Sequence, residues 1–190
     1  MFINNLTLML INMVAGFVLL ILYIGFGLGR GDQRRWVPGF AMTGLVALLT
    51  GLYTIWRWPL PGSYNIAFGE MTVLFGIIYL GAALALALGG NLLSVAVYAT
   101  LAGLAAIVVG VRIINLGMTL QPVMAGVGFI LAGASGPLLL ACHYAPANRA
   151  LRWIAVVALA LAALIFALTG YMAYWGHLAD YSGWPPGAVR

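Results

Sequence analysis

Six apolar segments, each about as long as a lipid bilayer is thick, divide this chain of 190 residues. The hydrocarbon core of a bilayer is about 30 Å thick, and about 20 helical residues span it. The segments therefore predict an all-α, polytopic membrane protein with a single transmembrane domain over residues 1–190. Its spans are expected at residues 5–29, 37–56, 70–88, 92–114, 122–143 and 153–177, and a short outer tail at residues 178–190.

The composition excludes a soluble protein and a nucleic-acid-binding protein. Hydrophobic residues make up 65% of the chain and charged residues only 6%, whereas about a quarter of an ordinary soluble domain is charged. The eight basic residues are scattered between apolar segments and do not form a basic stripe. Nucleic acid is therefore not an expected partner, and the partner of most of the surface is the lipid bilayer.

The arginines predict the orientation of the spans. Cytoplasmic turns of membrane proteins carry an excess of arginine and lysine. Five of the eight arginines fall in the turns after the first and fifth spans: Arg30, Arg34, Arg35, Arg149 and Arg152. This bias places the first, third and fifth turns in the cytoplasm and both chain termini outside.

Small residues spaced seven apart recur in the second, fourth and sixth spans. They are Gly44 and Gly51, Gly103 and Gly110, and Ala163 and Gly170. Residues seven apart lie on one face of a helix, and small residues let two membrane helices approach closely. The repeat predicts three helical hairpins in tandem. Its small-residue faces serve either close helix packing or a pore wall of exposed backbone.

Two ionisable residues lie at the margins of predicted spans. Glu70 opens the third span and Arg112 lies in the last turns of the fourth, almost equally far from the turn at residues 89–91. We therefore expect an intramembrane ion pair, because a lone charge in the bilayer is costly. Such a pair either fixes the register of a hairpin or gates and orients a solute.

Other polar and aromatic residues are predicted near the same outer face. The connection at residues 57–69 contains Pro59 and Pro61 and cannot form a continuous helix. It is expected to fold over an outer vestibule. The residues assigned to that vestibule are Tyr64, Asn65, Asn115, Tyr174 and His177. Anchoring at the membrane interface is the alternative explanation for the tyrosines.

Catalytic chemistry and bound cofactors are not expected. The chain has one cysteine, two histidines and three acidic residues, too few to assemble a metal or iron–sulfur site. His143 and His177 fall at opposite ends of the predicted spans, so they cannot ligate one haem. Nucleophile and acid–base motifs are also missing from the sequence. We therefore predict no catalytic residue, no metal and no cofactor, and a protein that is not an enzyme.

The chain resembles a family of small, uncharacterised prokaryotic proteins with six membrane helices, a domain of unknown function. The similarity covers TLMLINMVAGFVLL (7–20), RRWVPGFAMTGLVALLTGLY (34–53), WPLPGSYNIAFGE (58–70), GVRIINLG (110–117) and GYMAYWGH (170–177). This resemblance implies a multipass protein of a prokaryotic cell membrane and brings no function.

A fainter similarity links the chain to the urea and amide channels, whose subunits form rings. It rests on the hairpin repeat and on the stretch FGEMTVLFGIIYLGAA at residues 68–83. It implies that Phe75 and Tyr79 line a pore. Residues 122–140 lack the tryptophans typical of the fifth helix of those channels, so the similarity implies a path for a small solute and not for urea itself.

Two functions remain open. The leading hypothesis is a homo-oligomeric channel or facilitator for a small solute, with Glu70 and Arg112 at its outer mouth. The alternative is a non-transporting accessory or scaffold subunit of a membrane complex, which binds lipid or quinone. A helix bundle without a continuous polar passage would favour this alternative.

Overall fold

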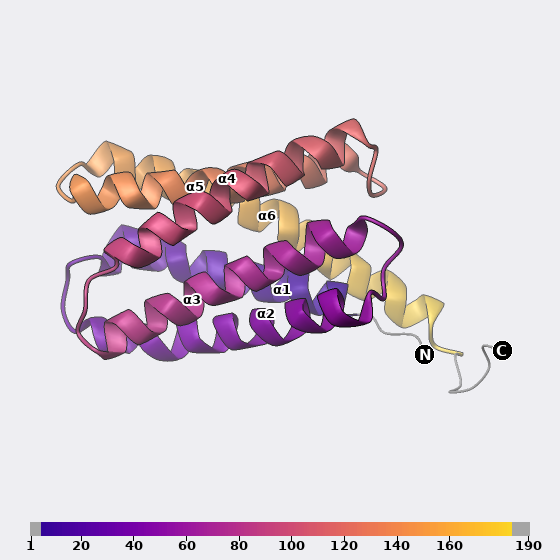
Figure 1. The fold of residues 1–190 in the computed structure, drawn as a ribbon, viewed down its shortest axis with the longest axis horizontal. Coiled ribbons are helices and arrows are strands. Elements are labelled where there is room, and N and C mark those ends of the chain that lie inside the picture. The colour runs from indigo at the N-terminus through magenta and orange to yellow at the C-terminus, as the bar shows by residue number, and fades with distance from the viewer. Residues whose placement is uncertain (1–4, 184–190) are drawn as a thin grey trace.

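The computed structural model describes residues 5–183, which form a bundle of long helices (Figure 1). The six main helices are α1 (Leu6–Leu22), α2 (Val37–Arg57), α3 (Met71–Ala87), α4 (Leu93–Asn115), α5 (Pro122–Tyr144) and α6 (Arg149–Asp180). Together with the short helical segments that adjoin three of them, all six are long and apolar enough to cross a membrane. The prediction of an all-α membrane protein with six spans is confirmed.

Short helical segments extend three spans. They are η1 (Tyr23–Gly27) after α1, η2 (Gln33–Trp36) before α2 and η3 (Asn65–Glu70) before α3. The third span therefore begins earlier than the predicted residue 70. The sixth begins earlier as well, because the Asn148 side chain accepts a hydrogen bond from the Leu151 backbone N–H at 3.1 Å and caps α6. Helix α6 also covers the start of the predicted outer tail, whose residues 184–190 lie outside the described part.

The helices pack most extensively as three antiparallel pairs, α2 with α3, α4 with α5, and α1 with α6. This pairing differs from the tandem hairpins predicted from the repeat. The small-residue face of α2 lies against α3, where a Cβ on Gly44 would stand 2.7 Å from the backbone nitrogen of Leu80. A Cβ on Gly76 of α3 would stand 2.6 Å from the backbone nitrogen of Leu48. The two backbones are therefore in direct contact.

Helices α4 and α5 make the closest contact of the bundle through glycines on both helices. A Cβ on Gly110 would stand 2.6 Å from the carbonyl oxygen of Gly126, and Gly103 lies against Gly133 in the same way. Real Cβ atoms essentially never approach a neighbour this closely. The small residues of α2 and α4 thus serve helix packing, which is one of the two roles predicted for them.

Helices α3 and α4 diverge from the turn at residues 88–92 that joins them. In Figure 1, α4 rises away from α3 toward its other end, where it lies beside α5. The cause is the glycine contact just described, because it ties α4 to α5 along much of its length. A wedge-shaped space between α3 and α4 results.

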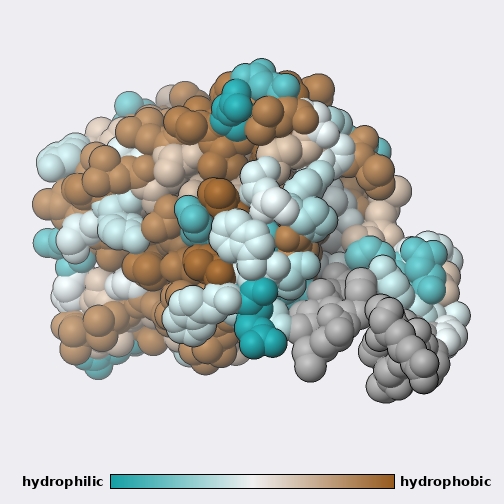
Figure 2. Space-filling model, turned by 45° about the vertical axis from the view of Figure 1, so that its right-hand side comes forward, coloured by the Kyte–Doolittle hydropathy of each residue, from teal (hydrophilic) through white to brown (hydrophobic). Residues whose placement is uncertain are grey.

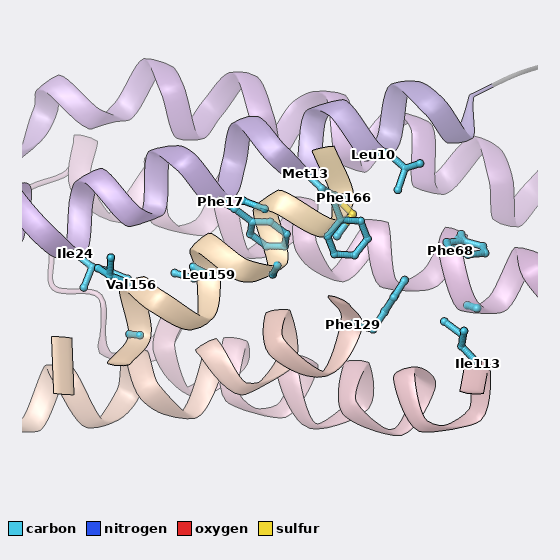
Figure 3. Packing of buried hydrophobic residues seen from close by; sticks show 14 of the residues in the cluster. Leu10, Met13, Phe17, Ile24, Phe68, Ile113, Phe129, Val156, Leu159 and Phe166 are labelled. Atoms are coloured by element: carbon cyan, nitrogen blue, oxygen red, sulfur yellow. The ribbon is translucent and has the colours of Figure 1, made fainter. Parts of the chain in front are cut away.

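Aromatic side chains fill the centre of the bundle at the interface of α1, α5 and α6 (Figure 3). The ring of Phe166 lies 5.7 Å from that of Phe17 and 5.6 Å from that of Phe129, measured between centroids. Phe129 in turn contacts Phe68 of η3 at 5.7 Å. These four rings are at most 8% exposed, so they form a buried aromatic cluster in the middle of the subunit.

The outer surface is apolar, as expected for contact with lipid. Large hydrophobic side chains are exposed on every one of the six main helices. On the face that Figure 2 shows, apolar residues cover most of the area and hydrophilic residues form scattered patches. Inside the bundle, polar groups bond between helices: the Asn12 side-chain amide donates to the Thr43 carbonyl at 2.8 Å, and that of Asn5 donates to the Thr54 hydroxyl at 2.6 Å.

Candidate functional site

The predicted ion pair between Glu70 and Arg112 is not formed in the structure. Both side chains are exposed, and no ion pair joins them within residues 5–183. Equal spacing from the turn brings Glu70 and Arg112 together only if the two helices stay side by side along their length. Helices α3 and α4 instead diverge (Figure 1). The divergence carries Arg112 away with α5, so the two charges face the surroundings separately.

Asn65 and Tyr64 hold the outer connection in place. Asn65 is completely buried, and its side chain accepts from the Leu60 N–H at 2.9 Å and donates to the Leu60 and Gly62 carbonyls. The Tyr64 hydroxyl accepts a hydrogen bond from the Thr119 N–H at 2.9 Å. This bond ties the 58–64 connection to the turn between α4 and α5. Asn65 is therefore an internal brace of the connection and does not line an open vestibule.

The other predicted vestibule residues lie at the same end of the bundle, on α4 and α6. Asn115 ends α4 and is exposed, and Tyr174 is exposed on α6. His177 is half-buried, with its ring Nδ1 3.3 Å from the Thr7 hydroxyl. Within residues 5–183, no side-chain hydrogen bond joins Asn115 or Tyr174 to Tyr64 or Asn65.

Phe75 and Tyr79, the predicted pore-lining residues, do face an empty space. Two neighbouring cavities lie in the wedge between α3 and α4, with residues of α1 and α5 at their base. We call them together the lateral groove. Both cavities are lined by Leu20, Ile78, Tyr79, Ala99 and Leu139. The groove runs between α3 and α4, and its second cavity reaches Phe17 and Phe129 of the aromatic cluster.

Most residues that line the lateral groove are apolar, and the polar ones are Tyr23, Tyr79, Ser135 and His143. Tyr79 is 4% exposed, its ring lies 4.3 Å from that of Phe75, and its hydroxyl has no hydrogen-bond partner within residues 5–183. A buried hydroxyl without a partner costs about 1–3 kcal/mol.

The wall of the lateral groove on α4 consists of small residues that the sequence reasoning missed. Ala99, Ala102, Gly103 and Ala106 line it. Only Gly103 belongs to the glycine repeat. The sequence does contain a signal for this wall. Ala99, Ala102 and Ala106 form a second row of small residues beside the row of Gly103 and Gly110, and no helix was predicted to pack against that second row.

The comparisons with known proteins identify a family. The family model described as "Protein of unknown function (DUF981)" matches residues 1–180. No curated protein and no solved structure matches the chain, so the similarity to the urea and amide channels is unsupported. The match spans all six membrane helices, and this chain belongs to the DUF981 family.

Proposed function

We propose that this protein is a membrane subunit that binds the apolar tail of a bilayer amphiphile, a lipid or a quinone, in the lateral groove. The observation that carries the proposal is the continuity of two apolar cavities beside lipid-facing helices. Each cavity has a volume of ≈ 80 Å³. This is less than the about 300–1,000 Å³ of a site that encloses a whole small molecule, so the proposal places a tail along the open groove, with one side toward the bilayer.

The chemistry of the groove fits such a tail. Its apolar wall offers contacts along a hydrocarbon chain, and the Tyr79 hydroxyl supplies one donor for an ester or quinone oxygen. Phe17, Phe129 and Phe166 pack against one another at the centre of the bundle, which favours a binding subunit over a polar passage at that place. This is the arrangement expected of a binding subunit, and the proposal assigns it no catalytic step.

The test is to fill the groove. Ala102→Phe adds a ring to the groove wall, and Ala105→Phe adds the same ring to α4 at a position outside the groove. We expect mass spectrometry of the purified protein to find the retained amphiphile reduced severalfold in Ala102→Phe and unchanged in Ala105→Phe. Equal retention in both variants would refute the groove as the site.

A homo-oligomeric channel for a small solute is the second candidate. It is supported by Phe75 and Tyr79, which line the groove, and by the apolar faces that a ring of subunits would cover. Since the subunit centre is filled, the path would run along the groove. Liposomes containing the protein should then pass small amides, ammonia or water faster than protein-free liposomes. Equal rates for all of these solutes would eliminate the channel.

We further propose the orientation that the arginines predict, in a prokaryotic cell membrane. The end of the bundle with the turns after α1 and α5 would face the cytoplasm, and both termini would lie outside. Cysteines introduced at Ala147 and at Ser63, with Cys142 replaced by Ala, should react differently with a membrane-impermeant thiol reagent in whole cells. We expect the reagent to label Ser63→Cys and not Ala147→Cys. Labelling at Ala147→Cys and protection at Ser63→Cys would show that the protein has the opposite orientation.

A further inference from the structure

We infer that the lateral groove continues into a cationic pocket that holds the phosphate of an anionic phospholipid, at Arg30, His143 and Arg152. The inference rests on the proposed function, because it assigns a headgroup to the molecule whose tail lies in the groove. The pocket and the groove are both lined by Leu28, Cys142 and His143. One molecule can therefore occupy both.

The three basic residues come from distant parts of the chain. Arg30 follows η1, His143 lies near the end of α5, and Arg152 lies in the first turn of α6. The packing of α1 against α6, and of α6 against α5, brings them to one pocket. In the sequence, Arg30 and Arg152 indicate only the orientation of the spans, and no pattern there predicts that the two share a cavity.

Arg152 is positioned by the fold and retains an unused donor. Its guanidinium Nη2 donates to the Leu28 carbonyl at 2.8 Å, which fixes the side chain at the edge of the pocket. Its Nε is buried and has no hydrogen-bond partner within the part of the chain that the structure describes. A guanidinium suits phosphate because it offers several N–H donors in one plane.

The charged residues around the pocket are mostly positive. Arg30, Arg34, Arg35, Arg149 and Arg152 lie at this end of the bundle, and Asp32 is the sole carboxylate in the turns there. The Asp32 side chain accepts from the Arg34 backbone N–H at 2.9 Å and caps η2. Glu70 and Asp180 belong to the opposite end. Basic pockets between membrane helices on the cytoplasmic side commonly bind anionic headgroups, and the apolar groove beside this one provides for the acyl chain.

The experiment compares two lipids that differ only in the headgroup. The full-length protein is delipidated in detergent and titrated with phosphatidylglycerol or phosphatidylcholine of identical acyl chains, and native mass spectrometry counts the bound molecules. We expect phosphatidylglycerol to bind more tightly, and each arginine removed from the pocket to weaken it about fivefold. The variants are Arg152→Gln and Arg30→Gln. Arg30→Gln removes no hydrogen bond made by its side chain within residues 5–183, so it keeps the test valid if Arg152→Gln fails to fold.

Arg34→Gln is the matched control, because Arg34 is exposed on the same turn and does not line the pocket. An equal loss in Arg34→Gln and Arg30→Gln would mean attraction to surface charge in general and would overturn the inference. Displacement of the lipid by inorganic phosphate at equal concentration would do the same, because it would indicate a site for free anions.

The two proposals fail in different ways. If both lipids bind equally, Ala102→Phe blocks them and Arg30→Gln has no effect, the headgroup site is refuted and the tail site stands. If neither lipid binds, or Ala102→Phe changes nothing, the proposed function itself is refuted. Preference for phosphatidylglycerol that is lost in Arg30→Gln and kept in Arg34→Gln supports both.

Discussion

Replacement of Gly110 by alanine should disturb the contact between α4 and α5 and destabilise the protein by up to about 2 kcal/mol. The added Cβ would stand 2.6 Å from the Gly126 carbonyl oxygen, 2.9 Å from a side-chain carbon of Ile130 and 3.1 Å from its backbone nitrogen. Two of these three atoms are backbone, so a rotamer change cannot relieve the contact. Overpacking of this kind costs about 1–3 kcal/mol, and alanine returns about 1 kcal/mol through its higher helix propensity.

Gly176→Ala in α6 is the matched control. It introduces the same methyl group into a helix, but nothing lies within 4 Å of the new Cβ. The gain in helix propensity is therefore not offset by a steric clash. This variant should be as stable as the original protein or up to about 1 kcal/mol more stable.

The assay is equilibrium unfolding of purified protein in mixed micelles, with helix content followed by circular dichroism. The difference between the two alanine variants should be at least about 1 kcal/mol, with Gly110→Ala the less stable. If Gly110→Ala equalled Gly176→Ala in stability, the backbone contact between α4 and α5 would not be as close as described. The assignment of the glycine stripe to packing would then be refuted.

Three further substitutions test the outer end of the bundle. Asn65→Ala should cost about 1–3 kcal/mol of unfolding free energy and speed proteolysis of the 58–64 connection, because the Leu60 N–H and carbonyl lose their partners; an unchanged cleavage rate would contradict this. Tyr64→Phe should cost about 0.5–1.5 kcal/mol and increase amide hydrogen exchange at Thr119, which loses its acceptor; unchanged protection there would argue against the bond. Glu70→Gln should change the unfolding free energy by less than about 0.5 kcal/mol, since its exposed carboxylate forms no ion pair within residues 5–183; a loss above 1 kcal/mol would mean that a partner holds it.

The six spans could be predicted because bilayer thickness sets both their length and their apolar character. The ends of the spans were less predictable, since they depend on individual hydrogen bonds such as those of Asn65 and Asn148. The helix partners were not predictable from the repeat. A stripe of small residues indicates that a helix packs closely, but Gly44 and Gly110 carry no information about which neighbour they meet. The structure selects the following helix in both cases.

The candidate site was predicted in part. Phe75 and Tyr79 were predicted from the resemblance to line a pore, which stays a prediction, and in the structure they line the lateral groove. The space itself results from the divergence of α3 and α4, which no local pattern encodes. The joining of Arg30 with Arg152 depends on the contact between the first and last helices. Sequence spacing cannot indicate a meeting of residues that are this far apart along the chain.

The pairing of α1 with α6 also bears on how the protein is made. Helices enter a membrane in the order of their synthesis, so α2 with α3, and α4 with α5, can each associate soon after the second member emerges. Helix α1 has its most extensive partner in α6. The bundle therefore cannot complete its assembly until α6 has been synthesised, and until then the face of α1 that carries Leu10 and Ile11, which contact Gly170 of α6, remains open to lipid or to a chaperone of membrane insertion.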